Sequence, residues 1–303
     1  MSIYRFLFDR AAAFTVPVLT VCTFLVSFHP LAAEETTEKQ MPIRIRMNVA
    51  HRGASVKRPE NTVPAYVQAI VDGATGAECD VYRSADGVIF LCHDDTTRKT
   101  LAGTTNDEKI TSLSYEEIRK RDAGAWKGEQ FKGIRAPTLD EYLQVLKGSS
   151  CHPVIEIKMD GIAEQVIDVV KKADMLNVAA IIAFSEQAVK DVRRIEPKMP
   201  VAWLYSESLK DKGTPEENAD RLAAFLIGKS KALDTNMLDL GHDMLSAPLI
   251  KKLQAEGIHV WAWTVNDPQR MKQLLDWGIE SITTDKPDLL TKILEERKQL
   301  KVN

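Results

Sequence analysis

The sequence contains little cysteine, and this limits how disulfides could hold the chain together. Only 4 of its 303 residues are cysteine, and Cys22 lies in the N-terminal segment, which leaves Cys79, Cys92 and Cys151. Three is an odd number, so no complete disulfide framework can form among them. All three lie in or beside apolar, strand-like runs, and we expect them to be buried core residues. A Cys79–Cys92 bridge is the alternative in an oxidising compartment.

An excess of basic residues, internal repeats and low-complexity tracts are also missing. The formal net charge of -3 and the pI near 6.1 argue against a general nucleic-acid-binding protein. With 44% hydrophobic and 27% charged residues, the chain can bury a full core and is not of the disordered type. Its length fits either one large α/β barrel or two ordinary domains.

The N-terminal segment has the layout of a secretory signal peptide. Arg5 and Arg10 precede an apolar run over residues 11–28, and small residues follow at Ala32 and Ala33. We expect a signal peptide over residues 1–33, cleaved after Ala33, and a polar linker over 34–46. An uncleaved membrane anchor formed by residues 11–28 is the rival reading, because that run is nearly long enough to span a bilayer. Either reading predicts an exported protein, periplasmic or extracellular.

From residue 47 onward, short apolar runs alternate with amphipathic stretches. The strand-like runs are Met47–Arg52, Ala77–Arg83, Pro153–Lys158, Ala179–Phe184, Pro200–Tyr205, Met237–Leu240, His259–Val265 and Ser281–Thr284. The helical stretches are Thr62–Val71, Leu139–Leu146, Ile162–Ala173, Glu186–Ile195, Glu217–Leu226, Ala247–Glu256, Pro268–Trp277 and Lys286–Leu300. Eight strands alternating with eight helices predict a (β/α)8 TIM barrel over residues 47–303, with an open doubly wound sheet as the second choice.

One segment, at about 84–137, breaks this alternation. Ala85-Asp86-Gly87 is a hairpin-turn signal, and Val88–His93 reads as a strand returning beside Ala77–Arg83. A polar stretch follows, with a short helical piece near Ser114–Arg121. We expect a β-hairpin and an insertion over the mouth of the barrel, where long loops carry function.

Ionisable residues gather at the expected ends of the first strands. Glu78 and Asp80 share one face of their strand because side chains two apart point the same way, and Glu156 lies near the end of the next barrel strand. The C-terminal strand ends form the site of a barrel, so we expect these three carboxylates to converge. Converging carboxylates repel one another unless a hard divalent cation with oxygen ligands joins them. Structural salt bridges with nearby lysines and arginines are the alternative.

Two histidines and two cations accompany the carboxylates. His51 ends the first strand and His93 ends the hairpin strand, where each could transfer protons. Arg52, followed by Gly53, and Lys158 could contact a phosphate, or could simply compensate the acidic cluster. Trp263 is a candidate wall of the substrate pocket, with core packing as the alternative. Four polar residues at or near strand ends rank no higher than supporting groups: Asp94, Asp239, His242 and Asn266.

These residues stand in an ordered series of motifs. The series comprises His51-Arg52-Gly53, Pro59-Glu60-Asn61-Thr62, Glu78-Cys79-Asp80-Val81, Asp86-Gly87 leading to His93-Asp94, Pro137-Thr138-Leu139, Glu156-Ile157-Lys158, Trp261–Asn266 and Thr283-Thr284-Asp285-Lys286-Pro287. In this order, from about Asn48 to Leu294, the chain resembles the glycerophosphodiester phosphodiesterase family.

The resemblance implies a barrel that uses one Ca²⁺ or Mg²⁺ ion to hydrolyse glycerophosphodiesters to glycerol 3-phosphate and an alcohol. It also implies roles: Glu78, Asp80 and Glu156 as metal ligands, His51 and His93 as the acid/base pair, Arg52 and Lys158 as phosphate contacts, and Glu60 near the metal site. We favour His51 as the base and His93 as the acid. The partner is then a small glycerophosphodiester and not a nucleic acid, with membrane contact only through an uncleaved N-terminus or a lipid substrate.

Three other functions remain open at this point. A phospholipase D-like enzyme acting on lysophospholipid or sphingolipid would use the same barrel and ion. A non-catalytic barrel that only binds phosphodiesters would not need both histidines. A sugar-cleaving barrel would use Glu78 and Glu156 as its carboxylate pair.

Overall fold

The computed structural model of the protein describes residues 48–101, 107–207 and 214–300. The expected signal peptide at 1–33 and linker at 34–46 lie outside the described residues. Among the helices that are described, none has the length and apolar character needed to cross a membrane.

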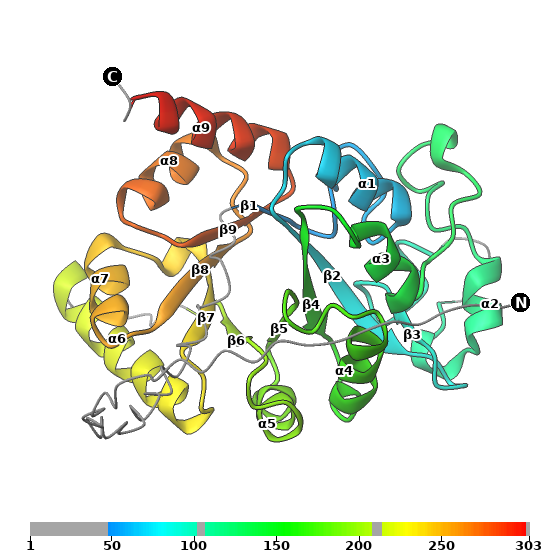
Figure 1. The fold of residues 1–303 in the computed structure, drawn as a ribbon, viewed down its shortest axis with the longest axis horizontal. Coiled ribbons are helices and arrows are strands. Elements are labelled where there is room, and N and C mark those ends of the chain that lie inside the picture. Colours follow the sequence, from blue (N-terminus) through cyan, green and yellow to red (C-terminus); the bar gives the residue numbers. More distant parts are fainter. Residues whose placement is uncertain (1–47, 102–106, 208–213, 301–303) are drawn as a thin grey trace, which may run out of the picture. The chain divides into compact units, whose positions relative to one another are not determined.

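A closed parallel sheet forms the centre of the described fold (Figure 1). Strand β1 pairs with both β9 and β2, and this double pairing closes the ring. The eight parallel strands of this described ring are β1 (Asn48–Ala50), β2 (Gly76–Arg83), β4 (His152–Ile157), β5 (Ala180–Ala183), β6 (Val201–Tyr205), β7 (Met237–Gly241), β8 (His259–Trp263) and β9 (Ser281–Thr284). The predicted (β/α)8 barrel is confirmed, and the open sheet is excluded.

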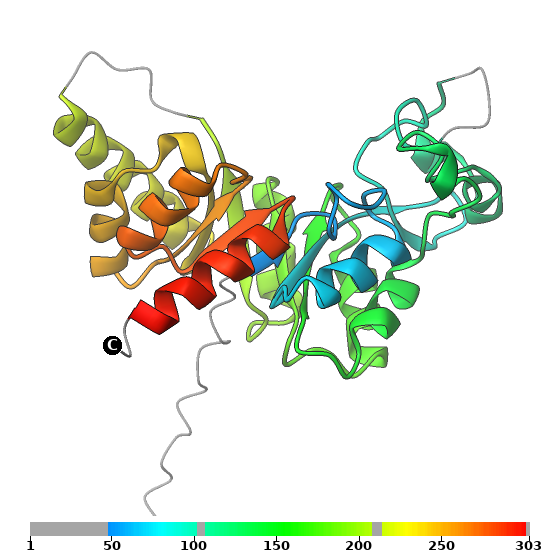
Figure 2. The same cartoon turned by 90° about the horizontal axis from the view of Figure 1, so that it is seen from above.

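Helices connect the strands and cover the outside of the ring. They are α1 (Val63–Val71), α3 (Leu139–Leu146), α4 (Ala163–Lys172), α5 (Glu186–Ile195), α6 (Pro215–Ala232), α7 (Ala247–Ala255), α8 (Pro268–Asp276) and α9 (Pro287–Leu300). The side chains of Ser185, Ser246 and Asp267 cap the N-termini of α5, α7 and α8. The C-terminal helix α9 lies against β1 (Figure 2). The side chain of Asn48 donates hydrogen bonds to the Pro287 carbonyl and to the Thr291 hydroxyl.

Alternating strand residues divide the apolar core into an inner and an outer part. The inner part fills the ring and consists of Val49, Val154, Ala180, Ile182, Ala202, Leu204, Met237 and Trp261. The outer part packs the other face of each strand against the helices. The interior is therefore a packed core at one end, and polar groups enter it only toward the C-terminal ends of the strands.

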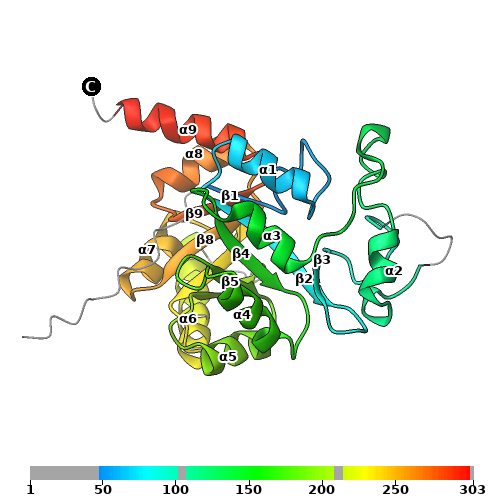
Figure 3. The same ribbon diagram turned by 45° about the vertical axis from the view of Figure 1, so that its right-hand side comes forward.

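The segment between β2 and α3 forms the expected hairpin and insertion. Strand β3 (Ile89–Leu91) pairs antiparallel with β2, and α2 (Tyr115–Lys120) follows, with η1 (Ile110–Ser112) and η2 (Glu129–Phe131) around it. Its own small core includes Phe90, Ile110 and Ile118. Figure 3 shows α2 on the side of β2 and β3, away from α6, α7 and α8. Lys127 of this insertion donates to the backbone of Ser55 in the β1–α1 loop at 2.6 Å.

The three described cysteines are buried and no disulfide joins them, as the core reading predicts. The alternative bridge between Cys79 and Cys92 does not form. In the β2–β3 register Val81 lies opposite Leu91, so Cys92 comes opposite Asp80 and is offset by one residue from the position facing Cys79. The two thiols consequently belong to different clusters of the core.

Candidate active site

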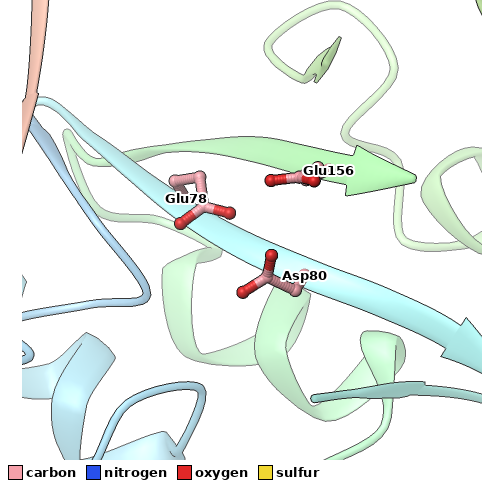
Figure 4. Close-up of side chains that lie close together, drawn as sticks. All are labelled: Glu78, Asp80 and Glu156. Carbon is pink, nitrogen blue, oxygen red and sulfur yellow. The ribbon is translucent and has the colours of Figure 1, made fainter. Parts of the chain in front are cut away.

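Three buried carboxylates meet at the C-terminal end of the barrel. Asp80 of β2 lies beside Glu156 of β4 in the parallel register, and Glu78 precedes Asp80 by two residues on the same face. One oxygen from each residue lies within 4.8 Å of the others. Figure 4 shows Glu78 and Asp80 extending from one strand and Glu156 from its neighbour, with the carboxylates facing one another. The convergence that the sequence predicts is present.

The electrostatics of this cluster fit a bound cation. Burial raises the pKa of Glu78 well above its usual value, and the Asp80 and Glu156 charges raise it further. Burial also raises the pKa of Glu156 to about 7. Glu78 Oε1 is buried without a hydrogen-bond partner in the described part of the chain, and Asp80 Oδ1 has an ion pair with Lys158 but no hydrogen bond there. Carboxylate oxygens that are close together, dehydrated and only partly satisfied are suited to a hard divalent ion.

Arg52 and Lys158 lie directly beside these acids. Lys158 Nζ is 2.8 Å from Glu156 Oε1 and 3.3 Å from Asp80 Oδ1, and Arg52 Nε is 3.3 Å from Asp80 Oδ2. Burial opposes ionisation of Asp80, but these two cations hold the pKa of its carboxyl below its ordinary value. Glu60 contacts the guanidinium of Arg52 at 2.8 Å and does not reach the acidic cluster itself. Both cations thus compensate the charge of the acids.

His51 is fixed by a carboxylate that the sequence analysis did not assign. Its Nδ1 lies 2.6 Å from Oδ1 of Asp285, which follows β9. Asp285 also accepts hydrogen bonds from Ser55 and Asn266. Burial alone would raise the pKa of Asp285, but the hydrogen bond and charge of His51 hold it well below its ordinary value. A histidine held in this way through Nδ1 has Nε2 available to exchange a proton.

His93 lies just beyond β3 and is partly buried. Its Nδ1 is 2.9 Å from Oδ1 of Asp94, the neighbouring residue. Burial lowers the pKa of His93, and the positive charges of Arg52 and Lys158 act in the same direction while Asp80 opposes them. Asp80, Arg52 and Lys158 are thus close enough to His93 to affect its charge. His93 therefore lies on the side of the cluster formed by β2 and the hairpin.

Asn61 is a second residue of the site that sequence reasoning missed. Its Nδ2 donates to Asp80 Oδ2 at 2.7 Å, and its Oδ1 accepts from the Asp80 amide and the Tyr66 hydroxyl. Arg52 and Asn61 both have positive φ, 55° and 54°, and the Asn61 amide donates to the Arg52 carbonyl. Left-handed backbone at non-glycine residues is uncommon and concentrates at functional sites. Asn61 lies inside the Pro59-Glu60-Asn61-Thr62 motif, which was its only signal.

The remaining candidates lie at or just after the ends of β7 and β8. Trp263 is half-buried, donates from Nε1 to the backbone of Asp239 at 3.0 Å and meets Phe184 edge to face at 5.4 Å. Asn266 donates a hydrogen bond to Asp285, and its contact with the site runs through that residue. His242 follows β7, beside the exposed Asp243.

Carboxylates suited to a hard cation lie with two histidines at the C-terminal face of a parallel barrel. This arrangement is typical of a barrel enzyme with a candidate metal centre. The chain belongs to the glycerophosphoryl diester phosphodiesterase family, whose model matches residues 51–289. It is therefore a phosphoric diester hydrolase by family, and the resemblance drawn from the motifs is confirmed.

Individual relatives agree with this assignment. The chain is 29% identical to a glycerophosphodiester phosphodiesterase of Caldanaerobacter subterraneus, over 82% of this chain and 97% of the relative. It is 27% identical to a glycerophosphodiester phosphodiesterase of Bacillus subtilis, over 94% and 98%. Among solved structures, a phosphodiesterase of Oleispira antarctica in complex with the product sn-glycerol 3-phosphate superposes with a TM-score of 0.70 at 24% identity, over 83% and 97%. That last likeness supports the fold.

Proposed function

We propose that this enzyme hydrolyses glycerophosphodiesters to glycerol 3-phosphate and an alcohol, with one divalent cation held by Glu78, Asp80 and Glu156. The observation that carries the proposal is the set of three buried carboxylates whose oxygens lie within 4.8 Å of one another, on strands β2 and β4. His51 and His93 follow β1 and β3, which both pair with β2. Family membership indicates the reaction, and the carboxylates and the two histidines are the groups that can perform it.

The cation is Ca²⁺ or Mg²⁺, because all three donors are carboxylates and neither thiol nor imidazole is among them. When bound, such an ion neutralises negative charge on the phosphoryl oxygens and polarises the phosphorus centre. Arg52 and Lys158 lie beside the same carboxylates and provide two further positive charges for the phosphate.

His51 acts as the base and His93 as the acid. Asp285 accepts a hydrogen bond from Nδ1 of His51, so Nε2 of that ring can take a proton from the hydroxyl group that attacks the phosphorus. Asp285 then stabilises the imidazolium that forms. Burial lowers the pKa of His93, which makes its protonated form a stronger acid toward the leaving alkoxide.

The assay follows release of glycerol 3-phosphate from glycerophosphocholine by the purified protein. EDTA should abolish the release, and Ca²⁺ or Mg²⁺ should restore it. His51→Ala and His93→Ala should each lower kcat by at least about 100-fold. A substrate panel with lysophosphatidylcholine and sphingomyelin separates the diesterase from a phospholipase D-like enzyme. Failure to hydrolyse any diester with either ion supplied would refute the proposal.

We also propose that the protein is exported through residues 1–33 and that the barrel domain begins near residue 47. The basic start, apolar run and small residues before position 34 support this. N-terminal sequencing of the protein recovered from cell fractions tests it. A mature protein beginning at Glu34 in an extracytoplasmic fraction is expected, and a cytoplasmic protein beginning at Met1 would contradict it.

A further inference from the structure

Asp239 is a fourth buried acid at the same end of the barrel, and the mechanism above does not use it. It lies on β7 between Met237 and Gly241 and is 1% exposed. Neither of its carboxyl oxygens has a hydrogen-bond partner among the residues that the structure describes. Buried polar groups in native proteins nearly always have partners, so an unpartnered carboxyl indicates a place for a ligand or for water.

The neighbours of Asp239 on the adjoining strands are apolar. In the parallel register it lies beside Leu204 of β6 and Trp261 of β8, and both belong to the inner core of the barrel. No cation compensates it within this surrounding, unlike Asp80, which has Arg52 and Lys158. The carboxyl of Asp239 is therefore a single polar group in an apolar wall, an arrangement typical of small-molecule pockets.

Asp239 and Glu156 both point into the barrel, because each lies two residues after an inner-core residue of its own strand, Met237 and Val154. Burial raises the pKa of Asp239 well above the usual value, and the nearby charged group that adds to this effect is Glu156, one of the three acids of the cluster. At the same strand ends, Phe184 and Trp263 form an aromatic rim. Phe184 is 46% exposed, and the Trp263 ring is fixed by its hydrogen bond to the Asp239 carbonyl.

We propose that Asp239 binds the free hydroxyl groups of the glycerol moiety, while Trp263 and Phe184 contact its carbon atoms. This inference rests on the proposed function and assigns the residue that recognises the free vicinal diol of its substrate. The two oxygens of a carboxyl group can accept from, or when protonated donate to, adjacent hydroxyls. The aromatic rings provide the apolar surface that a carbon backbone requires. A glycerol bearing an acyl chain has lost one of these hydroxyls and fits the subsite poorly.

The test compares two ligands that share the phosphate and differ in the diol. Binding of glycerol 3-phosphate and of propyl phosphate is measured by calorimetry in the presence of Ca²⁺, for the parent protein and for Asp239→Leu. We expect the parent to bind glycerol 3-phosphate about tenfold more tightly than propyl phosphate. The Leu side chain fills similar space without polar atoms, so this preference should vanish while propyl phosphate binds unchanged.

Melting temperature distinguishes binding from structural support. Removing an unpartnered buried carboxyl should leave the melting temperature of Asp239→Leu equal to or above that of the parent. Asp239→Asn, which keeps one oxygen and the shape, should bind glycerol 3-phosphate with intermediate affinity. The matched control is Asp243→Asn, which changes an exposed carboxylate two residues after β7 and should alter neither ligand.

Three results would overturn the assignment of Asp239. They are a diol preference that survives in Asp239→Leu, an equal loss for both ligands, and a parent protein that hydrolyses lysophosphatidylcholine faster than glycerophosphocholine. The binding measurement needs no turnover, so it is separate from the hydrolysis assay. A parent that prefers glycerol 3-phosphate but hydrolyses nothing would retain the subsite and contradict only the proposed function.

Discussion

Asp285 fixes the orientation of His51, the proposed base. It accepts hydrogen bonds from His51 and Ser55 of the β1–α1 loop and from Asn266 of the β8–α8 loop. Asn266 also accepts from the Asp285 amide, so the carboxylate is held from two directions. The ring of His51 is thus positioned by a partner far away in sequence, as hydrogen-bonded carboxylates position metal-ligating and catalytic histidines elsewhere.

Replacing Asp285 with Asn should lower kcat for glycerophosphocholine by about 10- to 100-fold and change KM little. The amide cannot stabilise imidazolium and can favour the wrong tautomer of His51. Steady-state kinetics over pH 5 to 9 measures the effect. The pH profile of kcat should change on its acidic limb, where the base becomes protonated. Asp288→Asn is the control. Asp288 lies three residues after Asp285, is half-exposed and forms an ion pair with Lys57. Equal losses in both variants would mean that Asp285 has no specific role.

The residues of the site could be predicted where strand geometry alone places them. Glu78, Asp80 and Glu156 follow from alternation along two neighbouring strands, and the structure brings them together. Asn61 and Asp285 could not be found in this way. Asn61 reaches Asp80 only because the loop after β1 adopts left-handed backbone at Arg52 and Asn61, and residue spacing does not specify such a loop.

The β1–α1 loop depends on one glycine. Gly53 has φ of +82°, and a Cβ atom there would lie 2.7 Å from both the carbonyl carbon and the Cβ of Ala65 in α1. The loop therefore packs directly on the first turns of the helix. This close approach holds Arg52, whose amide donates to Glu78 at 2.7 Å. The position of Arg52 is thus linked to the packing of α1.

Comparing Gly53→Ala with Gly87→Ala separates the cost of steric overlap from the cost of positive φ at a non-glycine residue. Gly87 also has positive φ, +90°, but nothing lies within 4 Å of a Cβ there. We expect Gly87→Ala to reduce the free energy of unfolding by about 1–2 kcal/mol. Gly53→Ala should cost about 1–3 kcal/mol more because of the overlap with Ala65. Chemical denaturation measures both, and equal costs would show that the loop can move away from α1.

Element identities were predictable because the barrel repeats one pattern, whereas element lengths were less so. The sequence predicts that the fifth barrel helix ends at Leu226, but the corresponding helix α6 continues to Ala232. Gly228 costs only about 1 kcal/mol within a helix, and buried residues beyond it, such as Leu233, favour continuation. At the other end Thr214 forms a capping box with Glu217, so the helix also begins earlier than predicted.

At the scale of the whole molecule, the acidic cluster makes stability depend on pH. Glu156 has a pKa of about 7 in the folded chain without an ion, because of its burial and its proximity to Asp80. An unfolded glutamate titrates near 4.3. The folded state consequently binds more protons than the unfolded state between these values, so stability falls as pH rises through this window. A bound divalent ion should oppose this loss, because it requires the ionised form.

The melting temperature of the EDTA-treated protein should therefore fall between pH 5 and pH 8. Addition of Ca²⁺ should raise it more at pH 8 than at pH 5. Glu156→Gln should reduce both the pH dependence and the response to the ion, because its amide does not titrate and is a weaker ligand. An increase from Ca²⁺ that is the same at both pH values would argue that the ion binds elsewhere.

The position of the ion is the central claim, and anomalous diffraction from crystals grown with Mn²⁺ tests it most directly. Mn²⁺ takes the same oxygen ligands as Mg²⁺ and Ca²⁺. We expect one strong peak within about 2.0–2.6 Å of oxygens from Glu78, Asp80 and Glu156. A peak bound by other residues, or none at these three carboxylates at saturating Mn²⁺, would contradict the account.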